Sequence, residues 1–289
     1  YCFDSIGDPQ STIKYLNDFL EINPYCEIAW HHLGKQYAKN KMYQEALSAF
    51  DFAIISDDSF IGAYLEMAKV LEKLNRINEA IEKYEISIGI NQPTSFALFR
   101  IGKCHHKLRN NDLALSYFIQ TIEEDPIHDK AWMSIALHYF NKQDFNESKI
   151  NLLKALEIES DKIKYWELFI KINIKLEVFE EVELGIKEIL SLGQLNINTL
   201  TFLTETLIKM PQNDNLFNGL LKSINLFPKS AENEINYLLS AIYFTIQEKE
   251  NAISHLKKAY FYNPSKYDYF KKMFPLIPKL HVFKNAHII

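Results

Sequence analysis

Apolar side chains recur along the chain at intervals of three and four residues, as they do on one face of an α-helix. The pattern also repeats over a longer distance. The segment from Ile28 to Tyr37 matches the segment from Lys130 to Tyr139, at an offset of 102 residues, which is three times 34. Because short polar stretches divide each 34-residue block in two, the pattern predicts repeated pairs of antiparallel helices joined by tight turns.

Blocks of 34 residues follow from this period, with a slip of two residues at Ala231 and Glu232. The blocks span residues 27–60, 61–94, 95–128, 129–162, 163–196, 197–230 and 233–266. Residues 266–276 predict a final capping helix. The tail over residues 277–289 lacks helical periodicity, and we consider it either a flexible end or a docking segment.

Residues 1–26 are predicted to form a half repeat, which is the second helix of an earlier repeat. Pro24 lies six residues before Trp30, as Pro126 lies six residues before Trp132. An unpaired second helix leaves apolar surface uncovered, so we infer that an upstream repeat is missing or that the N-terminal stretch forms a cap. The chain begins with Tyr1 and not with methionine, and we expect it to be a fragment.

The same positions of each block carry the same kind of side chain. Position 4 is large and often aromatic, whereas positions 8 and 20 are small in the clearest blocks. The small residues are Gly34, Ala68, Gly102, Ala136 and Ser240 at position 8, and Ala46, Ala80, Ala114, Ser148 and Ala252 at position 20. Small residues let two antiparallel helices approach closely. Residues 163–230 depart from the pattern, and we expect looser packing or another helix angle there; the replacements are Ile170, Val182, Thr204 and Leu216.

Over about 240 residues this pattern resembles the tetratricopeptide repeat (TPR) family. The resemblance implies an all-α fold, an α-solenoid in which antiparallel helix pairs stack into a right-handed superhelix. It also implies that positions 2, 5, 6, 9, 12 and 13 of each first helix line a concave face that binds partners.

The candidate partner-binding residues come from these positions. They are His31, Lys35, Leu65, Lys69, Phe99, Arg100, Lys103, Met133, Leu137 and Lys171. Position 9 is lysine in three successive blocks, with apolar residues between the charges. We therefore predict a locally basic groove that suits an extended acidic peptide or a C-terminal carboxylate. The alternative is that these lysines are solvated, as lysines are on any exposed helix.

Some family members bind chaperone C-termini through a carboxylate clamp. The corresponding positions here are His31, Lys35, Glu66, Phe96 and Arg100, and only Arg100 agrees with the clamp. We therefore do not expect binding of that kind. The same face becomes apolar toward the C-terminus, where it would hold a partner helix or residues 277–289.

Composition narrows the class of protein. Hydrophobic residues make up 47% of the chain and charged residues 24%, which is a globular composition, and no run of apolar residues is long enough to span a membrane. The net charge of −5 argues against a general polyanion binder. The three cysteines are odd in number and scattered, so we expect a reducing, cytoplasmic compartment.

No chemistry-bearing motif is evident in the sequence. The pair His31-His32 and the run Cys104-His105-His106 suggest a metal, but neighbours on a helix diverge by about 100° and cannot reach one ion. We interpret His105 as a core residue. We expect no metal, no cofactor and no enzymatic activity.

The leading hypothesis is a protein-interaction scaffold with a peptide or partner segment in its groove. An RNA-binding helical repeat is the first alternative, although such proteins normally carry a stronger excess of lysine and arginine. The second alternative is the docking arm of a larger multidomain protein, so that the chain would be a member of a larger complex.

Overall fold

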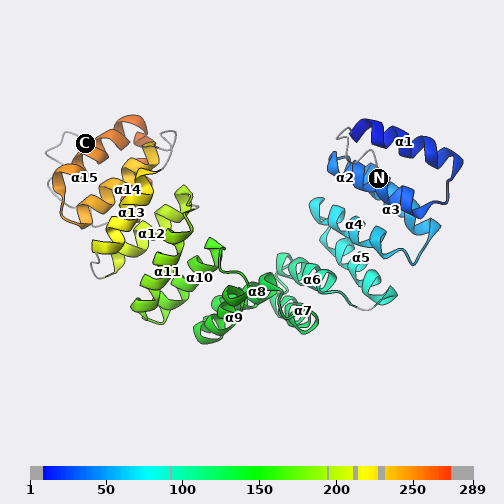
Figure 1. Ribbon diagram of the computed structural model, residues 1–289, viewed down its shortest axis with the longest axis horizontal. Coiled ribbons are helices and arrows are strands. Elements are labelled where there is room, and N and C mark those ends of the chain that lie inside the picture. Colours follow the sequence, from blue (N-terminus) through cyan, green and yellow to red (C-terminus); the bar gives the residue numbers. More distant parts are fainter. Residues whose placement is uncertain (1–8, 92, 194, 211–213, 227–231, 275–289) are drawn as a thin grey trace. The chain divides into compact units, whose positions relative to one another are not determined.

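The computed structural model describes residues 9–91, 93–193, 195–210, 214–226 and 232–274. The described residues form α-helices and one short 3₁₀-helix, without strands (Figure 1). The all-α prediction and the solenoid of stacked helix pairs are confirmed. Among the described helices, none is both long enough and apolar enough to cross a membrane. The chain divides into an N-terminal unit, residues 1–159, and a C-terminal unit, residues 160–289.

The N-terminal unit consists of one leading helix followed by helix pairs. Helix α1 packs on α2, and each later pair packs on the one before it. The first helices of the pairs are α2 (Glu27–Lys39), α4 (Ile61–Lys73), α6 (Ser95–Lys107) and α8 (Asp129–Asn141). The leading helix and the second helices are α1 (Pro9–Ile22), α3 (Tyr43–Ser56), α5 (Ile77–Ile90), α7 (Asn111–Glu124) and α9 (Phe145–Ile158).

The C-terminal unit continues the same alternation. Its helices are α10 (Ile163–Lys175), α11 (Phe179–Leu192), α12 (Ile197–Lys209), α13 (Asp214–Asn225), α14 (Glu232–Thr245), α15 (Lys249–Tyr262), the 3₁₀-helix η2 (Pro264–Lys266) and α16 (Tyr267–Met273). Helix α12 packs against both α13 and α14, and α14 pairs with α15.

Small residues on the first helices set the distance between the helices of a pair. A methyl group added at Gly34 would lie 2.5 Å from the ring of Phe50, and one added at Gly102 would lie 2.7 Å from the ring of Phe118. Both rings are buried, so neither has room to move. The predicted close approach is therefore present, with an aromatic ring of the second helix lying directly on the glycine of the first.

The turn inside six of the pairs, all but α12–α13, has one recurring conformation. The fifteenth residue of the block is left-handed although it is not glycine; these residues are Lys41, Asn75, Arg109, Gln143, Glu177 and Gln247, with φ between 59° and 67°. The next residue donates its backbone N–H to a carbonyl five residues back, for example Met42 to Tyr37 at 2.9 Å. This is the hydrogen bond of a Schellman motif, which ends the first helix and starts the reversal.

The aromatic residue at position 4 links successive pairs. The indole N–H of Trp30 donates to the carbonyl of Pro24 at 2.8 Å, and that of Trp132 donates to Pro126 at 2.9 Å. Trp166 makes the same bond to Ser160 at 2.8 Å. The six-residue spacing seen in the sequence is thus the span of a hydrogen bond across the turn between pairs.

The pair α10–α11 departs from the signature without losing its close approach. Ile170 occupies the usual small position and is fully buried. Space for it comes from Gly185 on α11, where a methyl group would lie 2.7 Å from Ile170. The small residue has moved to the second helix, so the looser packing expected from the sequence is not what this contact shows.

The C-terminal cap is partly described. Helix α16 ends at Met273, before the expected end at residue 276, and Phe274 is buried with Tyr237, Leu256 and Ala259. Phe274 thus packs against α14 and α15, as a residue of a capping segment is expected to do. The side chains of Phe270 and Met273 and the tail over residues 277–289 lie outside the described residues.

We expect Gly34→Ala to lower the free energy of unfolding by about 1–3 kcal/mol, because its new methyl group overlaps a buried ring. Gly89→Ala is the matched control. Nothing lies within 4 Å of a methyl group at Gly89, and that substitution should stabilise helix α5 by up to about 1 kcal/mol. Urea unfolding followed by circular dichroism measures both. Equal effects of the two substitutions would contradict the close-approach explanation.

Candidate functional site

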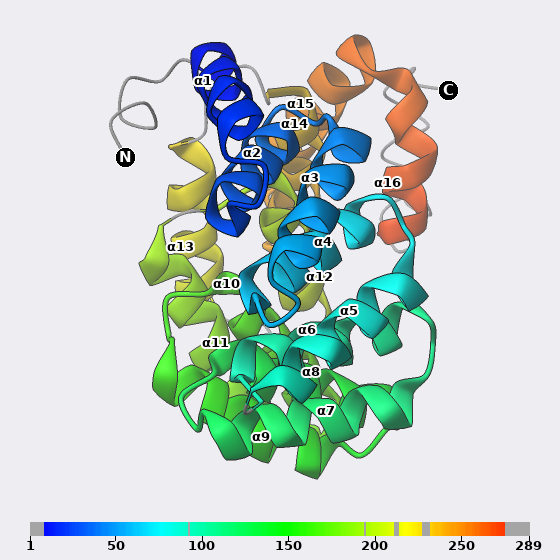
Figure 2. The ribbon, with the colours of Figure 1, turned by 90° about the vertical axis from the view of Figure 1, so that its right-hand side faces the viewer.

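Nine of the ten candidate residues lie on the successive first helices of the N-terminal unit. Three contacts show that these helices are neighbours. The ring of His31 on α2 lies 5.2 Å from the ring of Phe60 at the start of α4. The ammonium of Lys69 on α4 lies 4.9 Å from the ring of Phe96 on α6, and the ring of Phe99 on α6 lies 4.6 Å from that of His128 at the start of α8. We call this surface of α2, α4, α6 and α8 the first-helix face (Figure 2). The tenth residue, Lys171, lies on α10 of the C-terminal unit.

The candidate residues differ in exposure. Lys103, Leu137 and Lys171 are exposed, whereas His31, Lys35, Leu65, Lys69, Arg100 and Met133 are half-buried. Phe99 is buried in a core cluster with Phe118 and Ile135, so it supports the face from beneath. Phe96 occupies one of the clamp positions but is not among the ten candidates. It is 39% exposed on this face.

Lysines of this face lie over aromatic rings. Lys69 covers Phe96 at 4.9 Å, and Lys103 lies 5.9 Å from the ring of Phe99. In the C-terminal unit, Lys171 lies 5.2 Å from Phe202. Each such contact contributes about 0.5–1 kcal/mol at an exposed site. It also holds the ammonium group beside apolar surface, which gives the face its mixture of charge and apolar steps.

Charge is divided between the two layers of helices. The first helices α2, α4 and α6 carry seven lysines and arginines and three glutamates. The second helices α3, α5 and α7 carry one lysine and eight acidic residues. In these three pairs the first-helix layer is therefore basic in a chain whose net charge is −5, whereas α8 and α9 each carry equal numbers of acidic and basic residues.

Arg100 is committed to an internal ion pair. Its guanidinium lies 2.5 Å from the carboxylate of Glu72, whose side chain is only 5% exposed. Tyr84 donates its hydroxyl to the same carboxylate at 2.9 Å, and Lys107 donates to the other oxygen at 3.3 Å. Since this network joins α4, α5 and α6, we interpret Arg100 as a structural residue before a ligand-binding one.

Lys69 is also paired, with Glu66 on the same helix at 2.8 Å. Lys35 and Lys103 make no ion pair within the described part of the chain. The positive charge that is available to a partner on this face is therefore centred on Lys35 and Lys103, with Lys69 partly neutralised.

His31 is a packed residue more than a surface donor. Its ring contacts Phe50 and Phe60, and its Nε2 atom is buried without a hydrogen-bond partner among the described residues. Burial, followed by the charge of Lys35, lowers the pKa of His31 to about 4. His31 is therefore neutral at pH 7 and adds no charge to the face.

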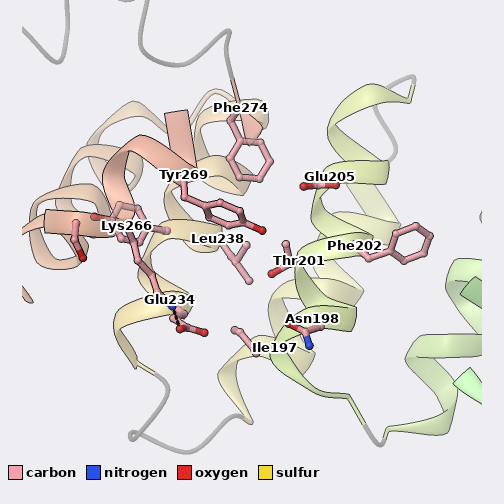
Figure 3. A pocket seen from close by; sticks show the side chains of 12 residues that line it. Ile197, Asn198, Thr201, Phe202, Glu205, Glu234, Leu238, Lys266, Tyr269 and Phe274 are labelled. Carbon is pink, nitrogen blue, oxygen red and sulfur yellow. Dashed lines mark hydrogen bonds and ion pairs between the residues drawn. The ribbon is translucent and has the colours of Figure 1, made fainter. Parts of the chain in front are cut away.

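The C-terminal unit contains a cleft of about 600 Å³ (Figure 3). It lies between α12 and α14 and is bordered by η2 and α16. The lining residues are Ile197, Asn198, Thr201, Phe202, Glu205, Glu234, Tyr237, Leu238, Ser265, Lys266, Tyr269 and Phe274. Phe202 and Tyr237, which belong to the face that becomes apolar toward the C-terminus, line this cleft. Glu205 and Glu234 are at positions 9 and 2 of their blocks, which the family resemblance assigns to the concave face, but neither is among the ten candidate residues. Residues of η2 and α16 complete the cleft once the C-terminal end is folded.

Titratable groups with shifted pKa values are scattered through the N-terminal unit. Burial raises the pKa of Cys104 to about 11 and raises that of Tyr84 as well. His105 stacks on Tyr117 at 5.5 Å. Within the described residues, no group of three or more histidine, cysteine or carboxylate side chains is arranged to hold a metal ion.

Family models of the tetratricopeptide repeat match residues 96–126, 129–162 and 234–266. These three stretches coincide with blocks identified from the 34-residue period. The chain therefore contains tetratricopeptide repeats at these residues, and the number of seven repeats stays a prediction.

Solved structures and a sequence relative agree with this fold. The C-terminal part of a TPR protein from Cytophaga hutchinsonii matches with a TM-score of 0.65 at 14% identity, over 81% of this chain and 96% of that chain. YrrB, described as a TPR protein with an unusual peptide-binding site, matches with a TM-score of 0.53 at 16% identity, over 64% of this chain and 95% of that chain. The anaphase-promoting complex subunit CDC16 of Saccharomyces cerevisiae is 23% identical over 164 residues, 55% of this chain, and the match spans 19% of that protein.

We expect Arg100→Met to lower the free energy of unfolding by about 1–3 kcal/mol, because it leaves the buried carboxylate of Glu72 without its closest charge partner. Lys103→Met, on the same helix, should lower stability by no more than about 1 kcal/mol, because it loses only the contact with the ring of Phe99. A double-mutant cycle with Glu72→Gln, measured by urea unfolding, gives the coupling energy. A coupling energy near zero would contradict a structural role for this pair.

His31 predicts a dependence of stability on pH. The folded pKa of about 4 lies below the ordinary value of 6.5, so the unfolded chain binds the proton between these values and the folded chain does not. The folded state with neutral His31 therefore keeps its full stability above pH 6.5, and it loses stability as pH falls from 6.5 toward 4. His31→Leu should reduce the loss of stability between pH 7 and pH 4.5 by about 1–2 kcal/mol relative to the wild type. Unfolding titrations at both pH values would refute this if the two proteins lost stability equally.

Proposed function

We propose that this protein is a non-enzymatic interaction scaffold whose first-helix face binds an extended acidic segment of a partner protein. The observation that carries the proposal is the division of charge between the helix layers. Seven basic residues lie on α2, α4 and α6, whereas the second helices of the same pairs are strongly acidic. An acidic segment is attracted to the first layer and repelled by the second.

The chemistry of the face defines the partner further. Lys35 and Lys103 offer ammonium groups free of ion pairs within the described residues, and Lys69 lies over Phe96. Between and beyond these charges lie apolar side chains, of which Leu137 is 39% exposed. A segment in which carboxylates alternate with apolar residues satisfies both kinds of surface. The paired state of Arg100 makes a carboxylate clamp an unsuitable model for this binding.

The relatives support the coarser part of this proposal. YrrB is described as having a peptide-binding site, and CDC16 is a subunit of a multiprotein complex. Protein partners and membership in a larger assembly are therefore the natural function for this chain. The chain corresponds to a limited part of CDC16, so the identity of the partner rests on the face and not on that relative.

The distribution of perturbed groups supports a non-enzymatic role. His31, Tyr84 and Cys104 have pKa values shifted by burial. Tyr84 and Cys104 share one core cluster, whereas His31 packs against Phe50 and Phe60. General acid–base or nucleophilic catalysis requires such groups to converge on one accessible cavity. The cleft in the C-terminal unit contains none of these three residues. Tyr237, which lines it, has a pKa that burial raises to about 12, and the other groups of shifted pKa named above do not converge on it.

A fluorescein-labelled 12-residue peptide that alternates glutamate with leucine and phenylalanine tests the proposal by anisotropy. We expect Lys35→Glu/Lys103→Glu to weaken its binding at least about tenfold, because two attractive charges become repulsive. Lys83→Glu is the control, since Lys83 lies on the second helix α5. Binding should also weaken as salt rises, because exposed charges are screened. Thermal melts establish that the variants are folded.

Two further probes separate the competing hypotheses. A peptide with lysine in place of every glutamate should not bind, and a 12-nucleotide single-stranded RNA should bind more weakly than the acidic peptide. Tighter, salt-dependent binding of the RNA would favour an RNA-binding repeat instead. Equal affinities of the double variant and the Lys83→Glu control for the acidic peptide would reject the first-helix face as the site.

A further inference from the structure

The cleft of the C-terminal unit has the opposite chemistry to the first-helix face. Its carboxylates are those of Glu205 and Glu234, and its only lining cation in the described part of the chain is Lys266. Lys266 forms an ion pair with Glu234. Glu205 makes no ion pair or hydrogen bond with any described residue, so one negative charge faces the cleft without a partner.

Apolar and hydroxyl-bearing side chains form the rest of the cleft. Leu238 and Ile197 lie on its floor, and Phe274 closes one side. Tyr269 extends from α16 toward Thr201 on α12, as Figure 3 shows. A volume of about 600 Å³ is within the range of sites that enclose a ligand or several side chains. The cleft therefore suits a segment that presents a basic residue among apolar ones.

The chain contains a segment of this composition directly after the cleft. Residues 275–289 include Lys279 and Lys284, two histidines and no acidic residue. The remaining positions are mostly apolar; they include Leu276, Ile277, Leu280, Val282, Phe283, Ile288 and Ile289. We propose that residues 275–289 bind in cis to the cleft between α12 and α14, with a lysine of this segment paired with Glu205.

Chain length allows this pairing. Phe274 itself lines the cleft, so the segment begins at its border. Lys279 is the fifth residue after Phe274. An extended chain spans about 3.3–3.6 Å per residue, which gives a reach of roughly 17 Å before the lysine side chain is added. A sphere with the volume of the cleft is only about 10 Å across, so Lys279 reaches any part of it.

Because residues 275–289 are attached to the chain beside the cleft, even a weak interaction is enough for them to occupy it. A segment tethered at the border of its site has an effective concentration in the millimolar range. An intrinsic dissociation constant of about 1 mM therefore populates the bound state. The consequence is regulatory: an external segment of similar chemistry has to displace residues 275–289 before it enters the cleft. This inference concerns another unit than the proposed peptide site and does not depend on it.

Carbodiimide coupling in the intact chain tests the proposal, because it joins carboxylates to amines only in direct contact. At low micromolar protein we expect mass spectrometry to detect links from Glu205 to Lys279 or Lys284. Glu205→Gln should abolish these links, whereas Glu180→Gln, an exposed control on α11, should leave their yield unchanged. The charge-swapped variant Glu205→Lys/Lys279→Glu/Lys284→Glu should restore coupling between the two segments.

Three outcomes would overturn the proposal. They are the absence of links to Glu205, links whose yield is the same after Glu205→Gln as after Glu180→Gln, and links that join two chains. Mixing ¹⁵N-labelled and unlabelled protein identifies the last case, in which the occupant is a second copy. Binding of the acidic peptide to the Glu205→Gln variant should equal that of the wild type, so failure of this inference is distinguishable from failure of the proposed function.

Discussion

The close approach of the two helices of a pair, as in α2–α3, α6–α7 and α10–α11, is the constraint on which the rest of the structure depends. Where Gly34 and Gly102 stand, an aromatic ring of the second helix lies on the backbone of the first, at a distance that excludes even one methyl group. In α10–α11 the large side chain is on the first helix and Gly185 on the second, and the approach is kept. In these three pairs one small residue at the contact, on either helix, is enough for the close approach, because interiors have no space for an added methyl group. The pair α12–α13 has Thr204 and Leu216 at the two small positions, so this rule does not extend to it.

This constraint assigns the remaining positions of the first helices to other tasks. Signature residues face the second helix and the next pair, so the residues between them are released from packing and carry charge. In the first three pairs that charge is basic, with an acidic layer behind it. Part of it is used internally, because Glu72 binds Arg100, Tyr84 and Lys107 and thereby joins α4, α5 and α6.

The two units present surfaces of opposite sign. The N-terminal unit has a lysine-bearing face in which aromatic rings lie beside the charges. The C-terminal unit has an open cleft lined by apolar residues and by Glu205, whose carboxylate has no charge partner among the described residues. A scaffold with both surfaces discriminates among segments by charge as well as by shape, since an acidic segment is repelled at the cleft and a basic one at the face.

The sequence by itself determined the helix pairs, their 34-residue period and the small residues at their contacts, because these depend on local periodicity and side-chain size. It also identified the helices that carry the candidate residues. Only the tertiary structure decided which of those residues are available: Arg100 is bound to Glu72, 28 positions away, and Phe99 is in the core. The cleft beside Glu205 likewise exists only after η2 and α16 fold against α12 and α14. Such pairings join residues that are distant along the chain, and the period of a repeat contains no information about the individual partners that meet in space.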